Sequence, residues 1–393
     1  MKRIENKAEC CGCEACKQAC PRNCIEMKQD EEGFFYPKVN LENCVDCGIC
    51  IKVCPFNNYE VPANDVKEAF VIQSKNDTIL KIVASGGAYA SIAKHIIDVG
   101  GISYGASFVG GQIRHTRAEN LLELEGHYSS KYVQSRMYDI FKKVREDLNN
   151  KKIVLFSGTG CQVVALKKLL NCNYDNLITI DLVCAGVSSP KILEEYTKEL
   201  EKKHQSKISY INFKEKTYGY NSSTMKIQFN NGDIYSRSRL TDPMMKIFTS
   251  RVAHRPSCSN CAIKGVNRYS DITLFDSWSY STLTRSKDND KGHTNIIVHS
   301  IKGLDILNEC KNSLYIENVP LDLAIELDGM NIIEQNSVSN KRDAFMYDYI
   351  NTGMKEAINK HIPITPADII KEQSKKYLYK LGILKTVKRI SKL

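Results

Sequence analysis

The N-terminal sequence CCGCEACKQACP, over residues 10–21, decides the fold of this chain because its pattern returns as CVDCGICIKVCP over residues 44–55. Each copy has the spacing C-x2-C-x2-C-x3-C-P, which is typical of thiolates that bind a pair of [4Fe–4S] clusters. In such a run three closely spaced cysteines bind one cluster, and the cysteine before the proline binds the other. The repeat therefore predicts a small two-cluster module at residues 1–60.

Crossed ligation divides eight of the cysteines into two sets of four. The first set is Cys10, Cys13, Cys16 and Cys54, and the second set is Cys20, Cys44, Cys47 and Cys50. Zinc also binds C-x2-C pairs, but zinc does not account for two triple-cysteine runs that each close with Cys-Pro. Cys11 and Cys24 fall outside the pattern, and we interpret them as packing or loop thiols. Because so small a unit has little core, we expect its clusters to hold it together as a bacterial-type ferredoxin domain.

The composition of the 393 residues, 42% hydrophobic and 25% charged, is that of a globular protein with two or three domains. It excludes a collagen-like or wholly disordered chain, and no apolar run is long enough to span a bilayer. Ten of the sixteen cysteines lie within the first 54 residues, and the charged start has no apolar stretch behind it. We therefore expect a cytoplasmic protein whose cysteines bind clusters instead of forming disulfides.

The formal net charge of +10 is concentrated at the C-terminus. Residues 371–393 carry eight Lys or Arg against one Glu, whereas residues 1–60 carry eight against ten Asp or Glu. A nucleic-acid footprint would be broader than a tail, so we expect no nucleic-acid partner. The tail predicts a basic helix that lies on an anionic membrane surface, docks on its own domain, or frays. Gly382 interrupts its apolar stripe, which argues against the membrane; the stripe consists of Tyr377, Leu381, Leu384 and Val387.

Beyond a linker at residues 57–64, the pattern alternates between strands and helices and predicts an α/β domain. We expect strands at 25–27, 33–37, 69–73, 102–108, 152–156, 177–183, 271–276 and 295–300, and helices at 87–99, 136–148, 162–170, 190–203 and 242–251. Residues 208–236 predict antiparallel strands with a hairpin turn at Asn231-Gly232, and residues 255–261 a loop. We expect residues 303–370 to be mostly helical. The expected fold class is α+β: a ferredoxin domain at 1–60, an α/β domain in two parts at 66–150 and 151–330, and a helical region with a basic tail at 331–393.

Two glycine-rich turns precede expected helices and are candidate phosphate sites. Ser85, Gly86 and Gly87 form the first turn, and Gly158 and Thr159 belong to the second. Backbone N–H groups at such turns can bind a phosphate, but neither turn matches the dinucleotide fingerprint or the Walker motif. Taken alone, a turn of this kind is more often a tight turn than a phosphate site.

Four further cysteines could hold a third cluster. Cys161 opens a helix and Cys184 ends a strand, so both lie at sheet ends, where ligand sites gather in α/β folds. Cys258 and Cys261 form a C-x2-C pair in a loop. The alternative is that each is a buried apolar thiol. We interpret Cys172 and Cys310 as ordinary core or surface residues.

From about residue 5 to 300, the chain resembles the beta subunit family of coenzyme F420 hydrogenase and dehydrogenase. The resemblance is carried by several short blocks, at residues 85–87, 129–135, 158–162, 184–190, 255–261 and 270–278. It implies an FAD in the α/β domain, and it favours the third cluster on Cys161, Cys184, Cys258 and Cys261. It also makes Ser85, Gly86, Gly87, Lys131, Tyr132 and Gln134 candidates for the flavin site, in addition to Gly158 and Thr159. The chain departs from the family pattern at Gly160, Ala185, Phe275 and Ser277.

The function that the resemblance implies is that of a flavin-dependent iron–sulfur oxidoreductase. A small-molecule hydride donor or acceptor, F420-like or other, would react at the flavin, and the clusters would exchange electrons with a redox partner protein such as a ferredoxin. The alternatives are a non-catalytic electron-transfer subunit, a ferredoxin-dependent reductase of an unknown substrate such as one of a polysaccharide pathway, and a redox sensor. The sequence shows no acid–base or nucleophilic constellation, so it identifies no catalytic residues.

Overall fold

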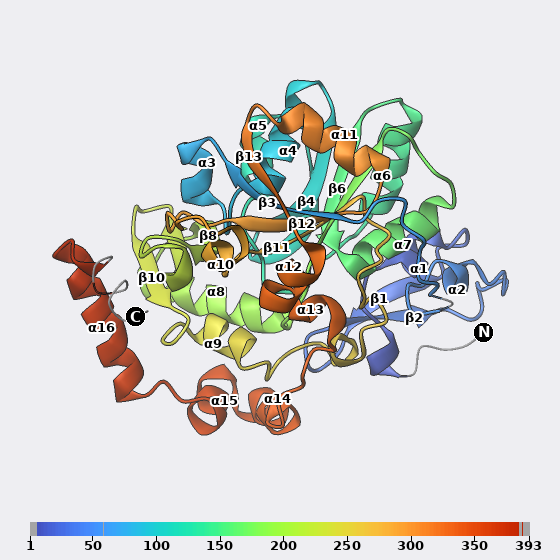
Figure 1. The fold of residues 1–393 in the computed structure, drawn as a ribbon. Helices are drawn as coiled ribbons and strands as arrows, with labels where there is room; N and C mark the ends of the chain where they lie inside the picture. Colours follow the sequence, from blue (N-terminus) through green and yellow to red (C-terminus); the bar gives the residue numbers. More distant parts are fainter. Residues whose placement is uncertain (1–5, 58, 385–386, 388–393) are drawn as a thin grey trace.

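The structure is a computed structural model that describes residues 6–57, 59–384 and 387. Within these residues, eight strands form one sheet in the order β13-β3-β12-β11-β7-β6-β4-β5 (Figure 1). The strands are β3 (Glu68–Ser74), β4 (Ile102–Val109), β5 (Gln112–Ala118), β6 (Val154–Thr159), β7 (Leu177–Leu182), β11 (Ile272–Asp276), β12 (Thr294–Val298) and β13 (Leu314–Val319). Segments 66–150 and 151–330 therefore contribute strands to the same sheet.

The middle of this sheet is parallel. Strands β4, β6, β7 and β11 run in one direction, and the outer strands β5, β12, β3 and β13 pair antiparallel with their neighbours. The carboxyl ends of parallel strands lie at one edge of a sheet, which is where ligand sites form in such folds. The segments that follow β6, β7 and β11, which start after Thr159, Leu182 and Asp276, consequently meet at that edge.

Helices cover both faces of the sheet. They include α4 (Ala88–Asp98), α6 (Ile140–Asn149), α7 (Gly160–Leu170) and α11 (Ile301–Cys310). On β6 and β7, Leu155 and Ile178 pack in the layer of α4 and α11, whereas Val154, Phe156 and Leu177 pack with α6 and α7. Alternate residues of one strand thus contact opposite layers, and the strand is apolar on both sides because both are buried.

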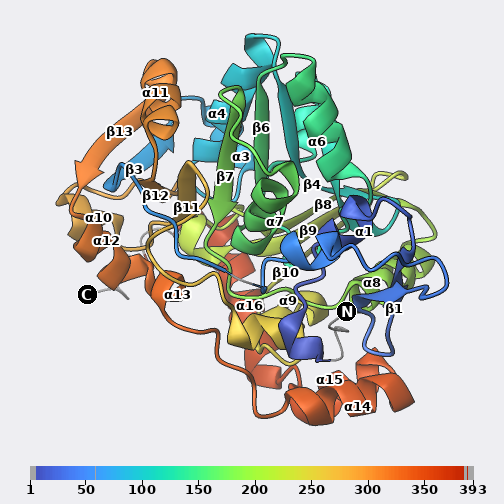
Figure 2. The same ribbon diagram turned by 90° about the vertical axis from the view of Figure 1, so that its right-hand side faces the viewer.

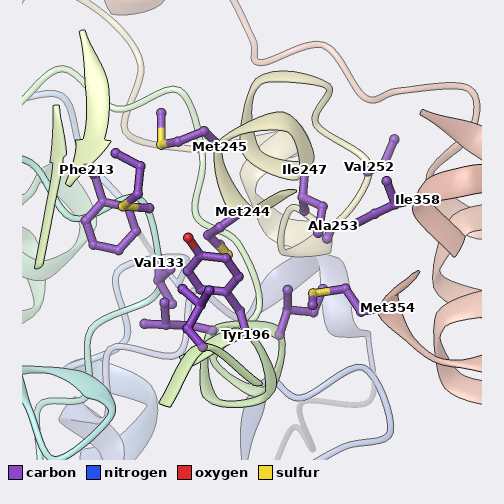
Figure 3. Packing of buried hydrophobic residues seen from close by; sticks show 14 of the residues in the cluster. Val133, Tyr196, Phe213, Met244, Met245, Ile247, Val252, Ala253, Met354 and Ile358 are labelled. Carbon is purple, nitrogen blue, oxygen red and sulfur yellow. The ribbon is translucent and has the colours of Figure 1, made fainter. Parts of the chain in front are cut away.

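A second sheet has three strands and packs with several of the later helices. Its antiparallel strands are β8 (Ile208–Glu215), β9 (Thr224–Phe229) and β10 (Ile234–Ser238). The helices that pack with it include α8 (Pro190–His204), α9 (Pro243–Thr249), α14 (Arg342–Thr352) and α15 (Met354–His361). Figure 3 shows the core between these elements, where Tyr196, Phe213, Met244 and Met354 are packed and Val133 joins them from the larger sheet's side.

Residues 6–57 form a separate small unit with an internal repeat. Its elements are η1 (Lys7–Glu9), α1 (Ala15–Ala19), β1 (Ile25–Gln29), β2 (Phe35–Val39) and α2 (Ile49–Lys52). Gly12 and Glu14 have φ of 67° and 62°, and the residues at the same places in the second copy, Asp46 and Gly48, have φ of 50° and 70°. These left-handed residues turn the two cysteine loops in the same way, so the sequence repeat is also a backbone repeat.

Buried polar contacts fix this unit to the larger domain, where Figure 2 shows α1 beside α7. The carboxylate of Glu14 accepts hydrogen bonds from Arg136 Nε at 2.6 Å and from the backbone N–H groups of Met137 and Tyr138. Arg342 donates to Glu32 at 2.5 Å from the far end of the chain. Since these charges are paired and all but the half-buried Glu32 are buried, the contact defines one orientation of the unit.

Most of the expected elements are confirmed. The predicted loop at 255–261 instead contains the short helix Pro256–Asn260, and the short helices Asp77–Ile82, Leu121–Glu125 and Tyr280–Thr284 were not expected. The other differences concern the start of α6 and the edges of the larger sheet. Strands β5 and β13 were not expected, and β13 lies inside the region predicted to be mostly helical. Both are edge strands whose exposed faces carry polar residues, so the apolar alternation that identifies a strand is weak there. Helix α6 begins at Ile140 instead of residue 136, because the backbone of Arg136 pairs with Ile113 and His115 of β5.

The C-terminal helix α16 (Pro366–Lys380) docks on the second sheet through Glu372, which is only 7% exposed. Glu372 accepts hydrogen bonds from Ser238 and Thr241 and pairs with Lys376, and these partners outweigh its burial and lower its pKa to about 2. Tyr377 and Leu381 are exposed, whereas Leu384 is buried. Residues 385–386 and 388–393 of the expected basic helix lie outside the described residues.

The remaining elements are short. They are α3 (Asp77–Ile82), α5 (Leu121–Glu125), α10 (Tyr280–Thr284), α12 (Leu321–Asp328), α13 (Met330–Ile333), η2 (Tyr220–Ser222) and η3 (Pro256–Asn260). In the described part of the chain, no helix combines the length and the apolar character needed to cross a bilayer.

The docking contact gives a first testable expectation. The substitution Arg136→Met would leave the Glu14 carboxylate buried without its charged partner, and we expect it to lower the free energy of unfolding by about 3–5 kcal/mol. Anaerobic denaturant titration followed by far-UV circular dichroism measures the change. The matched control, Lys207→Met, removes the exposed ion pair with Glu201 and should cost less than about 1 kcal/mol. Equal small effects of the two substitutions would contradict the docking argument.

Candidate functional site

The first set of four cysteines is assembled from both copies of the repeat. Cys10 and Cys13 are buried, and Cys54 is the second residue after α2. Burial raises the pKa of the Cys16 thiol, and the nearby thiols of Cys10 and Cys54 raise it further. The Cys13 thiol also lies near those of Cys16 and Cys54. The structure thus places Cys54 near cysteines of the first triple run.

The second set lies farther from the larger domain and closer to the surface. One small cavity is lined by Cys20, Cys44, Cys47 and Cys50, together with Cys24. Burial raises the pKa of the Cys50 thiol, and the thiols of Cys47, Cys20 and Cys44 add to this. The Cys24 sulfur is 3.3 Å from that of Cys20, so this thiol, interpreted from sequence as packing, is a fifth cysteine at the second set.

The donor chemistry of these cysteines fits iron–sulfur ligands. Backbone N–H groups are directed at several of the thiols, as for Cys54 from Phe56 and Asn57 and for Cys20 from Arg22, Asn23 and Cys24. Such hydrogen bonds stabilise thiolates and tune cluster potentials. Among residues 6–57, 59–384 and 387, no three His, Cys, Asp or Glu side chains converge on one metal ion. A four-iron cluster does not require such a point, because each thiolate binds its own iron atom.

A cavity of about 130 Å³ at the carboxyl edge of the larger sheet brings the four scattered cysteines together. Its lining includes Cys161, Cys184, Cys258 and Cys261. Burial raises the pKa of Cys184 to about 12, and the Cys161 and Cys261 thiols contribute to the shift. The sulfur of Cys184 accepts a hydrogen bond from the Gly186 N–H at 3.3 Å. We call this space the cysteine cavity.

The sheet explains why these cysteines meet. Cys161 is in the first turn of α7, directly after β6, and Cys184 is the second residue after β7. Strands β6 and β7 are adjacent and parallel, so both cysteines lie at the same edge. Cys258 and Cys261 come from the short helix η3 and the residue that follows it. The expectation that sheet ends gather these residues agrees with the geometry.

Cys11 also lines the cysteine cavity, which the sequence did not lead us to expect. Its thiol contacts those of Cys13 and Cys161. Because Cys13 belongs to the first set, Cys11 contacts both the first set and the cysteine cavity. The only sequence signal was the Cys10-Cys11 doublet, whose second member has no place in the repeat.

A larger cavity, of about 380 Å³, lies beside the cysteine cavity. The two share part of their walls, including Lys131, Thr159 and Cys184. Of the candidate flavin residues, Ser85, Gly87, Lys131, Tyr132 and Thr159 line the larger cavity, whereas Gln134 and Gly158 line the cysteine cavity. Gly86 is packed behind the wall: a Cβ there would be 2.4 Å from the carbonyl oxygen of Ile72.

The two glycine-rich turns differ in what their helix N-termini can bind. Gly87 has φ of 81° and begins α4 without any side-chain cap, so the free N–H groups of this helix border the larger cavity. Thr159 begins α7 with a capping box, in which Gln162 accepts from the Thr159 N–H at 2.9 Å. An uncapped N-terminus attracts an anion, whereas a capped one is already satisfied. The geometry therefore favours the first turn as the phosphate site.

Three of the candidate flavin side chains already have protein partners. The Lys131 ammonium donates to the carbonyl oxygens of Gly126, Tyr128 and Ser129, and burial lowers its pKa to about 7. Tyr132 stacks on Phe248, with 4.2 Å between the ring centroids. The Gln134 amide donates to the carbonyl oxygen of Gly12 at 3.1 Å. Lys131 thus holds the loop that borders both cavities, and Gln134 belongs to the docking contact of the small unit.

A charged and aromatic group at the rim of the larger cavity received no role from sequence. Asp276 lines the cavity and accepts hydrogen bonds from Lys214 Nζ at 2.6 Å and from the Tyr220 hydroxyl at 2.8 Å. Trp278 stacks on Tyr220 with centroids 4.3 Å apart, and the Lys214 ammonium is 4.3 Å from the Trp278 ring centroid. Asp276 is the last residue of the central strand β11, so the signal available in the sequence was its position at the end of a predicted strand.

Comparison with known proteins gives two family matches. Residues 9–58 match the 4Fe-4S dicluster domain, and residues 151–323 match the C terminus of the coenzyme F420 hydrogenase/dehydrogenase beta subunit. Among solved structures, the chain is similar to one in the F420-reducing [NiFe] hydrogenase complex from Methanosarcina barkeri, with 16% identity and a TM-score of 0.44. That similarity covers 76% of this chain and 90% of the other. No curated protein matches the sequence.

The crossed assignment of the two cysteine sets predicts the iron content of two double variants. Cys10→Ser with Cys54→Ser removes two ligands of one cluster and should lower the content by about four iron atoms per chain. Cys10→Ser with Cys20→Ser removes a ligand from each cluster and should lower it by about eight. Iron and sulfide analysis after anaerobic reconstitution measures both, with Cys172→Ser as the control. The opposite ranking of the two double variants would show that the sets are not crossed.

Proposed function

We propose a redox function with a bound flavin for this chain, which belongs to the coenzyme F420 hydrogenase/dehydrogenase beta subunit family and carries a 4Fe-4S dicluster domain. At the coarse level, it is an iron–sulfur protein related to an oxidoreductase subunit. The proposal adds an FAD in the larger cavity, a third [4Fe–4S] cluster in the cysteine cavity, and electron exchange between them. When bound, a flavin converts hydride transfer into single-electron transfer, and iron–sulfur clusters relay single electrons.

The observation that carries the proposal is the serial arrangement of the sites. The larger cavity shares the wall at Cys184 with the cysteine cavity. The cysteine cavity contacts the first set through Cys11 and Cys13. The first and second sets are interleaved in one small unit, since Cys16 also lies near Cys50. A continuous path for electrons therefore runs through neighbouring thiols from the larger cavity toward the surface.

The residues of the larger cavity suit a flavin nucleotide. The uncapped N-terminus of α4, after Gly87, would hold the pyrophosphate by its free N–H groups. Apolar and aromatic side chains such as Tyr132, Phe248 and Trp278 supply flat surfaces for rings. Lys131 keeps the loop between the two cavities in place. These residues bind and orient, and they exclude water from the wall that the flavin would share with the third cluster.

The substrate in this proposal is a small-molecule hydride donor or acceptor, of the F420 kind or another. Its entry would be at the rim formed by Asp276 and Trp278, where the Lys214 ammonium neutralises Asp276. The family pattern differs at Phe275 and Ser277 on either side of Asp276, so the rim is where this chain's substrate choice would be set.

The second set is the proposed point of exchange with a redox partner protein. Cys47 is the exposed member of the two sets, whereas those of the first set are buried or half-buried. Leu41, Val45 and Ile49 near it are 54%, 59% and 37% exposed. An apolar rim around an exposed thiolate suits a protein that carries its own one-electron centre and must approach closely.

The third cluster is tested by iron content. Cys161→Ser and Cys258→Ser should each lower the iron content by about four atoms per chain, and the double variant should lose no more than either single variant. Cys172→Ser, which changes an exposed cysteine away from the cavity, should keep all of the iron. Additive losses in the double variant, or full iron in both single variants, would contradict a third cluster at this place.

The flavin site is tested by introducing a carboxylate at the helix N-terminus. Ser85→Asp places a negative charge beside the α4 N-terminus, and we expect it to weaken FAD binding at least tenfold, or by about 1.4 kcal/mol. Quenching of flavin fluorescence during anaerobic titration measures the affinity. The control Asn76→Asp adds the same charge at the N-cap of α3, outside the cavity, and should leave the affinity unchanged. A wild-type protein with full iron and no FAD affinity would instead indicate an electron-transfer subunit without a flavin.

A further inference from the structure

Arg255 is the most deeply buried arginine of the described residues, at 1% exposed, and it lies at the contact between the small unit and the larger domain. Its guanidinium donates to the Cys10 carbonyl oxygen at 2.6 Å, to Gln134 Oε1 at 2.8 Å and to the Phe35 carbonyl oxygen at 3.0 Å. The remaining contact is with Cys10 Sγ, 3.5 Å from Nη2. All the oxygen acceptors are therefore neutral.

The other buried arginines of the described chain have carboxylate partners. Arg136 pairs with Glu14 at 2.6 Å, Arg342 with Glu32 at 2.5 Å, and Arg268 with Asp181 at 3.5 Å. Within the same residues, no carboxylate pairs with Arg255. A buried cation without a counter-ion is strongly destabilising, so the fold must supply negative charge at this place in another form.

The first cysteine set supplies that charge when it holds a cluster. A [4Fe–4S] cluster with four thiolates carries a net negative charge, and its charge becomes more negative by one unit on reduction. Cys10, a ligand in this set, is the residue that Arg255 contacts through both its carbonyl oxygen and its sulfur. The rings of Tyr36 and Phe34, 4.2 Å and 5.3 Å from the guanidinium carbon, keep water away from the other side.

We propose that Arg255 is the counter-ion of the first cluster and raises its reduction potential. The proposal rests on the proposed function in that it requires a cluster on Cys10, Cys13, Cys16 and Cys54. A fixed cation stabilises the more negative, reduced state more than the oxidised state, and the low dielectric of the buried contact strengthens this preference. Arg255 acts through the cluster and is a positioning residue, since it does not touch a substrate.

The same residue links two of the cluster sites. Arg255 immediately precedes the helix η3 that carries Cys258, a residue of the cysteine cavity, and its side chain contacts Cys10 of the first set. The positive charge of Arg255 therefore favours the reduced state of the first cluster, which lies next to the cysteine cavity. Electrons that come from the cysteine cavity would then enter the first cluster, and the potential of that cluster would be set by Arg255, a residue of the larger domain.

The experiment is a redox titration of anaerobically reconstituted full-length protein, followed by electron paramagnetic resonance. We assign the first cluster as the signal that Cys10→Ser removes. Arg255→Gln should lower the equilibrium constant for reduction of this cluster at least tenfold, which is ~59 mV for one electron. Arg255→Lys keeps the charge and should stay within about threefold of the wild type. The second cluster should not shift in either variant.

The matched control is Arg342→Gln, which removes another buried arginine of the same docking contact whose charge Glu32 balances. It should leave both potentials unchanged. An Arg255→Gln protein with full iron and an unchanged first potential would overturn the proposal. If the Arg255→Gln protein does not assemble its clusters, Arg255→Lys decides the question. A tenfold or larger drop in the equilibrium constant for reduction of the first cluster, in Arg255→Lys protein with full iron, would mean that shape and not charge matters at this position, and it would overturn the proposal. A wild-type protein without the two ferredoxin-type clusters would instead overturn the proposed function.

Discussion

The fixed contact between the small N-terminal unit and the larger domain is the constraint on which the rest of the structure depends. It is built from charges that are buried and paired, such as Glu14 with Arg136, and from the buried guanidinium of Arg255. Contacts of this kind are costly when misplaced, so they specify one orientation instead of a range of them. In that orientation Cys11 reaches Cys161, and the first cysteine set adjoins the cysteine cavity.

The central sheet supplies the second half of the arrangement. Its parallel strands end at one edge, where the ends of β6 and β7 line both cavities and the end of β11 lines the larger cavity. Residues separated by more than a hundred positions thereby line one space. The order from the larger cavity to the exposed Cys47 follows from these two features alone, namely where the sheet ends and how the small unit is docked against it.

Several site residues serve the architecture as much as a ligand. Lys131 donates hydrogen bonds to three carbonyl oxygens, and Gln134 hydrogen-bonds to both Gly12 of the small unit and Arg255. Both side chains therefore already have partners within the protein, which the sequence motif does not reveal. Thr159 caps its own helix. The uncapped start of α4 is the contrasting case, because its N–H groups border a cavity and have no side-chain cap. Local patterns alone could not distinguish these two glycine-rich turns.

The sequence by itself predicted the two ferredoxin-type cysteine sets, because these cysteines are close in the chain and their spacing limits which thiolates could share a cluster. It also determined the alternation of strands and helices, and with it the sheet edge at which Cys161 and Cys184 lie. Only the tertiary structure decided that Cys11 joins the cysteine cavity and that Arg255 is buried with no carboxylate partner among the described residues. The reason is physical: burial and charge pairing between distant segments depend on strand order and docking, and neither leaves a local spacing in the chain.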